Sequence, residues 1–286
     1  MSGTAIELYE TAFSYGQKPV FTDVSGKINR GEVVCLLGAN GCGKTTLMKC
    51  MNGLLTFGSG KAFIFGKDLY SLNSKDLAMK SAFVFQGYSQ VFSYSVTDIV
   101  LTGRGPHLGF FSFPGKADKQ KALSILENMH ISHLSSRYFP TLSGGEQQLI
   151  MIARALAQEP SILFLDEPAS ALDFGNQQYL LRTIKSLADV YGITIVMSTH
   201  YPNHALTVAD KIWAMKDGRI ISSGSPLEVL TEENIYKLYK VPARVVEVRE
   251  SGINSFAVIP LDDTTGDKED YFIPAGKGKQ NEQCKM

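Results

Sequence analysis

The sequence predicts an α/β fold: a mixed sheet, parallel at its centre and covered by helices on both faces, with an inserted helical subdomain. Three observations support this prediction. Short apolar, β-branched runs alternate with longer helical patterns, one run leads through a glycine-rich segment into a helix, and one stretch of different composition interrupts the alternation. Such alternation is typical of parallel strands buried on both sides. The 286 residues, 44% of them hydrophobic, are enough to bury such a core.

The strands of the expected sheet are short and apolar throughout, as buried parallel strands are. We expect them at residues 33–37, 81–85, 162–165 and 194–197. Nearer the C-terminus, residues 211–215 and 219–223 flank Asp217-Gly218, a pair suited to a two-residue hairpin turn. The sheet is therefore expected to have an antiparallel portion.

A change of composition between residues 87 and 140 indicates the inserted helical subdomain (87–140). Glycine, proline and aromatic residues cluster at 103–115, and a charged, helix-compatible stretch follows. The core is then predicted to comprise residues 1–86 and 141–240. Residues 241–286 form a C-terminal extension, whose last residues, rich in Gly, Lys and Gln, are expected to be disordered.

Charge and cysteine content disfavour several classes of function. Lys plus Arg and Asp plus Glu each number 28, so no excess of positive charge is available to bind a nucleic-acid backbone. The four cysteines, Cys35, Cys42, Cys50 and Cys284, have neither CxxC spacing nor closely spaced histidines, which predicts free thiols and no zinc site. No signal peptide or membrane-spanning run is found. If the protein works at a membrane, another chain is expected to supply the membrane part.

The glycine-rich segment at residues 38–45 fits the pattern GxxxxGK[ST] between a strand and a helix. Its glycines allow a sharp turn in which successive N–H groups point at phosphate oxygens, and the start of the helix favours the same anion. Lys44 is expected to contact the β- and γ-phosphates of ATP, and the Thr45 hydroxyl to bind Mg²⁺. The predicted nucleotide-binding residues of this segment are Gly38, Ala39, Asn40, Gly41, Cys42, Gly43, Lys44, Thr45 and Thr46. Cys42 is interpreted either as a redox switch or as a small residue that fills the loop.

Two acidic residues, Asp166 and Glu167, end the apolar strand at 162–165. Side chains alternate in direction along a strand, so neighbouring acids can take different tasks. Asp166 is expected to hold Mg²⁺, directly or through water, and Glu167 to act as the base that polarises the attacking water. Adjacent acids at a strand end often form only a solvated loop, but the phosphate-binding loop upstream favours the catalytic interpretation.

Residues 142–148, with the sequence Leu-Ser-Gly-Gly-Glu-Gln-Gln, resemble the signature motif of the ABC ATPases. Ser143 and Glu146 have the spacing of a helix capping box, and Gly144 and Gly145 leave backbone N–H groups open to an anion. Alone, the segment would predict only a helix cap. Between a phosphate-binding loop and an acidic strand end it indicates this family. The resemblance implies a P-loop NTPase (RecA-like) core with the α-helical subdomain characteristic of ABC ATPases.

Four further residues match motifs of this family, in order along the chain. The resemblance implies that Tyr15 stacks on adenine, that Gln86 senses Mg²⁺ and the attacking water, and that His200 contacts the γ-phosphate. It also implies that Asp173 organises a dimer interface. For each residue, an ordinary role in packing or at the surface is the alternative.

The resemblance further implies a head-to-tail dimer, in which the phosphate loop of one copy and residues 143–146 of the other enclose each ATP. ATP would stabilise the closed dimer, and hydrolysis would open it. An importer motor at the cytoplasmic face of the cell membrane is implied as well. Its partners would be a second copy of this chain, two copies of a transmembrane permease subunit, and an extracellular or periplasmic substrate-binding protein. No nucleic-acid partner is expected.

Two alternatives to an importer stay open: a free-standing ABC ATPase that acts on DNA or ribosomes, and a subunit of an ABC exporter. Lys44 and Ser143 are only 99 positions apart, with no heptad pattern, which disfavours the coiled-coil members that act on DNA. Similarity to importers of iron chelates, haem, cobalamin and oxyanions such as molybdate is found at residues 92–100, 103–109 and 198–205. The cargo is expected to belong to these classes. The aromatic stretch 103–115 is interpreted either as a docking surface for the membrane subunit or as an internal loop.

Overall fold

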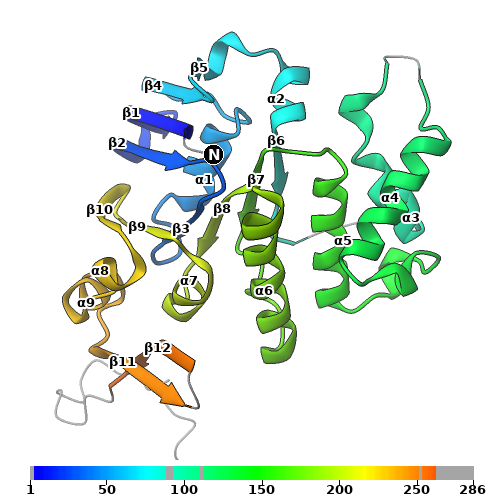
Figure 1. Ribbon diagram of the computed structural model, residues 1–286. Helices are drawn as coiled ribbons and strands as arrows, with labels where there is room; N and C mark the ends of the chain where they lie inside the picture. The colour runs from blue at the N-terminus through cyan, green and yellow to red at the C-terminus, as the bar shows by residue number, and fades with distance from the viewer. Residues whose placement is uncertain (1–2, 88–92, 110–111, 251–252, 262–286) are drawn as a thin grey trace, which may run out of the picture.

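The computed structural model describes residues 3–87, 93–109, 112–250 and 253–261 (Figure 1). At its centre is a six-stranded sheet with the order β10-β9-β3-β8-β7-β6. Its strands are β3 (Val33–Leu37), β6 (Ser81–Val84), β7 (Ile162–Asp166), β8 (Thr194–Thr199), β9 (Lys211–Lys216) and β10 (Arg219–Gly224). The pairs between β6, β7, β8, β3 and β9 are parallel, whereas β10 is antiparallel to β9. The predicted mixed α/β sheet is confirmed, including its hairpin at Asp217 and Gly218.

Helices cover both faces of this sheet. The helices of the described residues are α1 (Lys44–Met51), α2 (Ser74–Lys80), α3 (Val96–Thr102), α4 (Lys116–Asn128), α5 (Gly144–Leu156), α6 (Phe174–Tyr191), α7 (Pro202–Val208), α8 (Pro226–Val229) and α9 (Glu232–Tyr239), of which α3 and α4 lie to one side of the sheet. Short 3₁₀ helices are η1 (Leu69–Ser71), η2 (Gly105–His107), η3 (Ser132–Leu134) and η4 (Phe139–Thr141). In the described ranges, no helix combines the length and the hydropathy needed to cross a bilayer.

The central strand β3 is buried on both faces, which explains its unbroken apolar sequence. Val33, Cys35 and Leu37 belong to a core that α5, α6 and α7 share. Val34 and Leu36 belong to a second core that contains buried residues of α1. Because neither face meets water, the strand has no polar position, as expected for a parallel strand between two helical layers.

A second, antiparallel sheet, which the sequence pattern does not predict, lies beside the first. Its strands are β1 (Thr4–Tyr15), β2 (Lys18–Asn29), β4 (Ser59–Ile64) and β5 (Lys67–Asp68), in the order β2-β1-β4-β5. The pairing of β1 with β2 shifts register between Leu8 and Thr11, which breaks the regular alternation that would reveal the strand. Gly26 of β2 brings this sheet close to the core, because a Cβ there would lie 2.6 Å from the Trp213 ring of β9.

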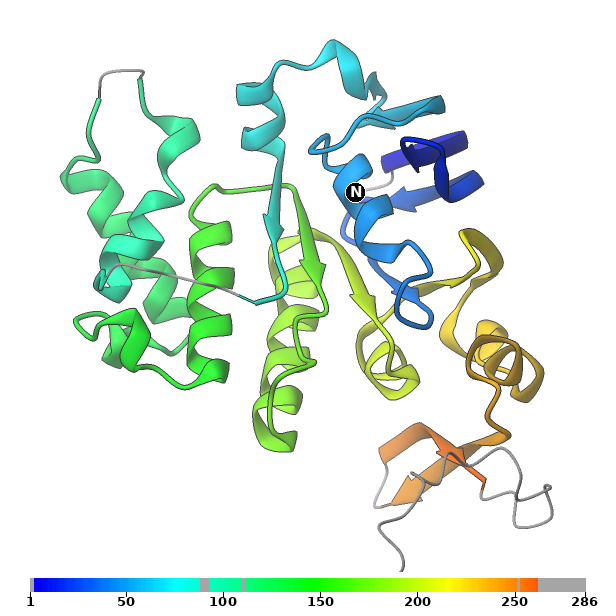
Figure 2. The same cartoon turned by 180° about the vertical axis from the view of Figure 1, so that it is seen from behind.

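The segment between α3 and α4 packs mainly inside the helical part of the protein, which lies to one side of the sheet (Figures 1 and 2). Arg104 pairs with Asp118 at 3.1 Å and with Glu159 at 2.9 Å, and His107 Nε2 lies 3.0 Å from the Gln158 carbonyl oxygen. These contacts favour an internal loop over a docking surface for the first part of the stretch. Phe113, by contrast, is 92% exposed. Residues 92, 110 and 111 lie outside the described residues, and the proposed boundaries at 87 and 140 stay a prediction.

A hairpin of β11 (Ala243–Glu250) and β12 (Ile253–Pro260) forms most of the described C-terminal extension. It makes a separate two-stranded sheet, and β12 contacts α7. Figures 1 and 2 both show the hairpin next to α7, below the central sheet. The predicted disorder concerns residues 262–286, which lie outside the described residues.

Candidate functional site

The phosphate loop follows β3 and leads directly into α1. Gly41 and Gly43 have φ values of 84° and 104°, in the left-handed region that favours glycine. Gly38 has no room for a side chain, because a Cβ would clash with the Met215 carbonyl oxygen. The N-cap residue of α1 is Gly43, which has no side chain that could cap the helix. Backbone N–H groups at the start of the helix are therefore open to an anion.

Lys44 folds back over this loop. Its Nζ donates to the carbonyl oxygens of Gly38 at 2.8 Å and Ala39 at 3.2 Å, and its side chain is only 5% exposed. Ala39, Asn40 and Gly41 are exposed along the rim of the loop. The ammonium group and the open N–H groups thus lie around one concave surface, an arrangement that fits a phosphate chain.

Oxygen atoms from three elements, α1, β7 and β8, meet beside the loop. The Thr45 hydroxyl, at the start of α1, donates to Asp166 Oδ1 at 2.8 Å, and Ser198 Oγ donates to the same oxygen at 2.7 Å. Asp166 is buried at the end of β7. Mg²⁺ prefers oxygen ligands and commonly takes only one or two carboxylates besides phosphates and water. The Thr45 and Asp166 oxygens fit such an ion, and the described residues contain no larger cluster of acidic, His and Cys groups that would bind a metal by itself.

Glu167 lies at the centre of the candidate site. Its Oε1 lies 3.7 Å from Lys44 Nζ, and its Oε2 lies 3.0 Å from His200 Nδ1 and 3.5 Å from Gln86 Nε2. Gln86 also donates to Ser170 Oγ at 3.3 Å. The backbone of Glu167 has φ of 46°, an uncommon value for a residue other than glycine, and functional sites are where such conformations gather. The carboxylate is 9% exposed, and a cation, an imidazole and an amide surround it.

Tyr15 ends β1, in a hairpin whose second strand, β2, reaches the phosphate loop. The residue is 54% exposed, and its ring packs edge to face on the Phe13 ring, with 4.9 Å between the ring centroids. The following strand passes the loop, since the Val20 carbonyl oxygen lies 3.2 Å from where a Cβ of Gly43 would be. An exposed aromatic face near the phosphates can stack on a flat base.

The signature segment forms the capped start of α5. Glu146 Oε2 accepts hydrogen bonds from the Ser143 backbone N–H at 2.7 Å and from its hydroxyl at 2.8 Å, and the backbone bond holds the pKa of Glu146 below its usual value. Gly145 lies against Asn176, whose side chain would be 3.2 Å from an added Cβ. Asn176 in turn bonds Asp173 at 2.9 Å and 2.7 Å. The signature segment and the loop around Asp173 are therefore neighbours in one chain.

The structure brings one set of predicted residues together and leaves another apart. The set that meets around the phosphate loop comprises Gln86, Lys44, Thr45, Asp166, Glu167 and His200. Among the described residues, no hydrogen bond or ion pair joins residues 143–146 to that loop. Figures 1 and 2 nevertheless show the start of α5 on the same side of the molecule as the carboxyl ends of the parallel strands. The starts of α1 and α5 thus belong to one face.

Cys42 is buried within the phosphate loop, and this burial raises the pKa of its thiol although Lys44 opposes the rise. Less thiolate is then available for oxidation, which favours a packing role over a redox switch. Its sulfur would lie 2.9 Å from a Cβ on Gly38, so it fills the space beneath the loop. Cys35 and Cys50 are also free and buried, and Cys284 lies outside the described residues.

The sequence profile of the family described as ABC transporter matches residues 21–170, more than half of the chain, including the phosphate loop, the signature segment and the acidic strand end. The chain belongs to the ABC transporter family. It is an ABC ATPase, and this confirms the resemblance on which the residue assignments rest.

Relatives of this ABC ATPase span nearly its whole length. The molybdate import ATP-binding protein MolC of Haemophilus influenzae is 34% identical over 260 residues, which cover 90% of this chain and 96% of that protein. The hemin import ATP-binding protein HmuV of Bordetella bronchiseptica is 37% identical over 239 residues, 81% of this chain and 90% of that protein. A solved structure of a metal-chelate type ABC transporter, in an inward-facing conformation, has a TM-score of 0.82 and 33% identity over 90% of this chain and 97% of the other.

Three groups that contact or surround the site of the ABC ATPase are not predicted by the sequence pattern. Ser198 holds Asp166 and accepts the backbone N–H of Glu167 at 2.9 Å. Ser198 lies on β8 directly opposite Asp166 in the parallel register, and the residues around it in the sequence carry no signal of this pairing. Ser170 bonds Gln86. The Tyr239 hydroxyl is buried without a hydrogen-bond partner among the described residues, and burial, followed by the charges of Cys42 and Glu167, raises its pKa.

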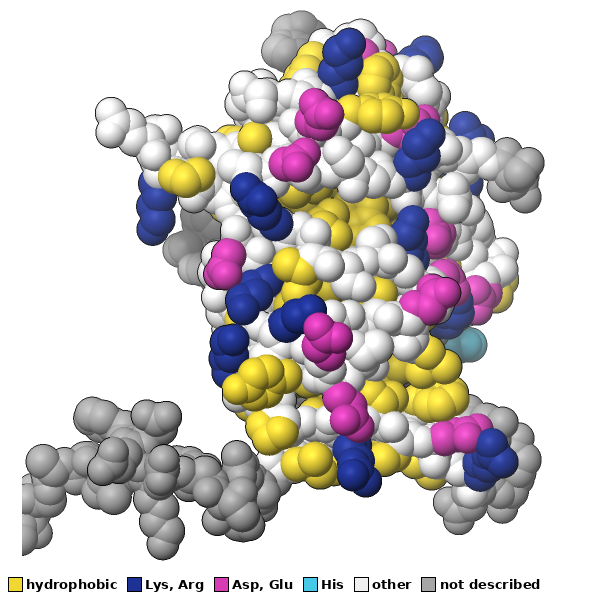
Figure 3. Space-filling view, turned by 90° about the vertical axis from the view of Figure 1, so that its left-hand side faces the viewer, with side chains coloured by type: hydrophobic (Ala, Val, Ile, Leu, Met, Phe, Trp, Pro, Cys, Tyr) yellow, Lys and Arg dark blue, Asp and Glu magenta, His cyan; other side chains and the backbone are white. Residues whose placement is uncertain are grey.

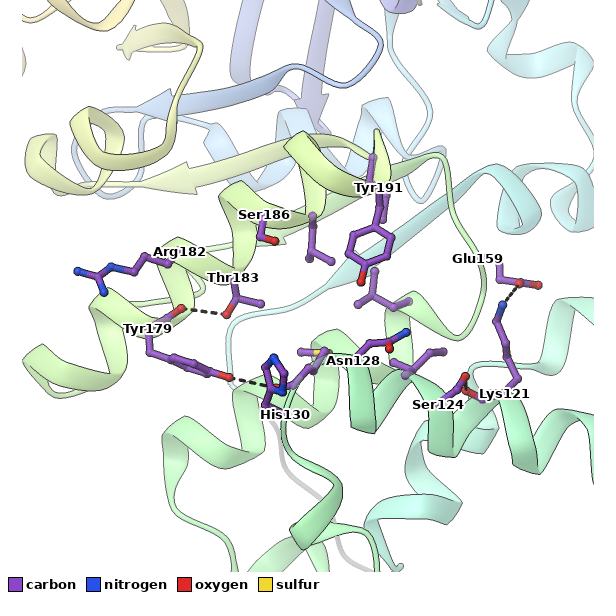
Figure 4. Close-up of a pocket in the computed structure, with 15 residues that line it drawn as sticks. Lys121, Ser124, Asn128, His130, Glu159, Tyr179, Arg182, Thr183, Ser186 and Tyr191 are labelled. Atoms are coloured by element: carbon purple, nitrogen blue, oxygen red, sulfur yellow. Dashed lines mark hydrogen bonds and ion pairs between the residues drawn. The ribbon is translucent and has the colours of Figure 1, made fainter.

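A groove of about 530 Å³ lies between α4 and α6 of the ABC ATPase (Figure 4). At one end Tyr179 points toward His130 and donates to the Met129 carbonyl oxygen at 3.0 Å, and at the other end Lys121 pairs with Glu159. None of the predicted site residues lines this groove. We therefore assign it no part in hydrolysis.

Proposed function

We propose that this ABC ATPase is the ATP-hydrolysing subunit of a membrane importer whose cargo is a metal chelate, such as an iron siderophore, haem or cobalamin, or an oxyanion. The observation that supports hydrolysis most directly is the position of Glu167, within reach of Lys44, His200 and Gln86. The cargo class is supported by relatives named for molybdate and hemin import and by the metal-chelate type of the structural neighbour.

The two alternatives have weaker support. An exporter subunit agrees less well with relatives that are named import proteins. A free-standing ATPase on DNA or ribosomes would need a positive surface, yet Lys and Arg are interspersed with Asp and Glu on the face that Figure 3 shows. The equal numbers of basic and acidic residues agree with this.

The proposed roles follow from where each group lies. Lys44 and the loop N–H groups bind the phosphates, and Tyr15 stacks on adenine. Thr45 and Asp166 hold Mg²⁺, which when bound neutralises charge on the phosphates. Glu167 accepts the proton of the attacking water, Gln86 orients that water and contacts Mg²⁺, and His200 donates to the γ-phosphate.

A second copy of the chain is proposed to complete each site. Residues 143–146 present a helix start proposed to bind an anion. Among the described residues it forms no hydrogen bond or ion pair with its own phosphate loop, although both lie on one face. A head-to-tail pair would place this start over the γ-phosphate of the partner copy. The adjacent loop around Asp173 would then lie in the dimer interface.

Two permease subunits and an extracellular or periplasmic substrate-binding protein are the further proposed partners, with the ATPase at the cytoplasmic face of the membrane. A groove of about 430 Å³, lined by the turn after α1 and by residues of α2, β6 and α5, offers a mainly apolar seat for a permease segment. Its lining includes Leu54, 52% exposed, and Phe85, 41% exposed. Because Phe85 directly precedes Gln86, a segment pressing on this groove would be linked to the hydrolytic site.

Leu54→Arg is expected to lower the fraction of the chain bound to membranes by about tenfold, because a charge would then face the apolar groove. Hydrolysis by the isolated chain is expected to stay unchanged, since Leu54 is half exposed and lies outside the nucleotide site. Leu227→Arg on α8, 47% exposed, is the matched control. Membrane fractions of host cells expressing tagged variants provide the measurement. Equal membrane binding of both variants would contradict the groove as the docking site.

Lys44→Ala is expected to weaken ATP binding by about tenfold, because the phosphate chain loses its nearest point charge. Fluorescent-nucleotide titration of the purified chain measures the change in ATP affinity. Phosphate release with Mg²⁺ present, compared with release in EDTA, tests hydrolysis.

Deleting the gene is expected to abolish uptake of one labelled cargo among an iron siderophore, haem, cobalamin and molybdate. Normal uptake of all four would contradict the importer proposal while leaving the ATPase unaffected.

A further inference from the structure

The helix that follows His200 is poorly fixed by its own sequence. α7 has only seven residues, and its N-cap, Tyr201, makes no side-chain cap. So short a helix has little stability of its own, and its position depends on neighbours. The His200 ring packs on Tyr201 with centroids 4.0 Å apart, and Tyr201 packs on His204 at 4.9 Å. Movement of the first turn of α7 would therefore move His200.

Asn203, in that first turn, is bonded to the C-terminal hairpin. The Val258 backbone N–H donates to Asn203 Oδ1 at 2.7 Å, and Asn203 Nδ2 donates to the Val258 carbonyl oxygen at 3.2 Å. The carboxamide thus pairs with both backbone groups of one β12 residue, as a neighbouring strand would. Val258 is itself buried in the main core, so the backbone to which Asn203 bonds is held in place by packing.

A second connection runs from α7 to α6. His204 Nε2 lies 3.4 Å from Gln177 Oε1, and Gln177 Nε2 donates to the Leu172 carbonyl oxygen at 2.9 Å. Leu172 precedes Asp173 in the loop proposed for the dimer interface. The first turn of α7 is therefore held between the C-terminal hairpin and α6.

We propose that Asn203 is a positioning residue for ATP hydrolysis, which holds His200 beside Glu167 by tying the start of α7 to the β11–β12 hairpin. The proposal rests on the proposed role of His200 at the γ-phosphate. Asn203 does not touch the reacting groups in the described structure. It acts through α7, and small displacements of a group at the reacting centre are enough to slow catalysis strongly. The hairpin thereby gains a function in the hydrolytic cycle.

Asn203→Ala removes both bonds to Val258 and is expected to lower kcat for ATP about tenfold, with KM changed less than about twofold, because the phosphate loop is untouched. The purified full chain is assayed by phosphate release, beside thermal unfolding. Ser255→Ala, exposed on the same strand, is the control and is expected to retain full activity. Asn203→Asp keeps an oxygen that can accept the hydrogen bond from the Val258 N–H, so this variant is expected to have an intermediate kcat. If the alanine variant does not fold, Asn203→Asp takes its place in the comparison.

A double variant separates positioning from simple stabilisation. If Asn203 acts through His200, adding Asn203→Ala to His200→Ala causes no further loss of kcat, whereas independent effects would multiply and overturn the proposal. A lowered unfolding temperature with unchanged kcat would also overturn it. An inactive His200→Ala beside a fully active Asn203→Ala would refute this inference and leave the proposed function standing. A fully active His200→Ala would refute the role of His200 and the inference with it.

Discussion

Glu167→Gln is expected to slow hydrolysis by at least about 10²-fold while ATP stays bound in a closed dimer. The amide has the shape of the carboxylate, so the contacts with His200 and Gln86 can persist, but it cannot accept the proton of the attacking water. Removing a negative charge beside Lys44 also lessens repulsion of the γ-phosphate. ATP binding should therefore be kept or strengthened.

Phosphate release and size-exclusion chromatography with Mg²⁺ and ATP measure the two parts of this prediction. Glu233→Gln on α9 is the matched control. Glu233 is exposed, and within the described residues its only ion pair is with Lys237, one helical turn away. Its turnover should equal that of the unmodified chain. Normal turnover of Glu167→Gln would exclude Glu167 as the base.

Ser143→Arg is expected to leave ATP binding to each chain intact but to prevent the ATP-dependent dimer and lower hydrolysis by at least about 10²-fold. The long side chain would occupy the space in which a partner's γ-phosphate is proposed to lie. Loss of the α5 cap costs only about 1 kcal/mol, so the chain should still fold. Nucleotide titration and light scattering measure binding and dimerisation separately.

The chain contains a close match for the control of this experiment. Ser225 caps α8 with the same pattern, since Glu228 Oε2 accepts its backbone N–H and its hydroxyl, each at 2.8 Å. Ser225→Arg therefore removes an equivalent cap away from the proposed interface, and dimerisation should survive it. Hydrolysis by a strictly monomeric Ser143→Arg would contradict a site shared between two copies.

Much of the core and of the phosphate site could be predicted because the signals are local. The turn glycines, Lys44 and Thr45 stand within eight consecutive residues, and their conformation depends on neighbours in the chain. The buried strands are apolar without interruption, so their type is evident. The sheet of β1, β2, β4 and β5 could not be predicted in the same way, because its register shifts hide the alternation and because β4 lies far from its partner β1 in sequence.

The sequence by itself determined the family, the phosphate loop, the acidic strand end and the capped start of α5, since each depends on residue types at short, fixed spacings. Only the tertiary structure decided which groups meet. Ser198 reaches Asp166 across 32 positions, and Asn203 reaches Val258 across 55. Such contacts arise from strand register and from the packing of elements on a common core, and neither is encoded in the residues next to them.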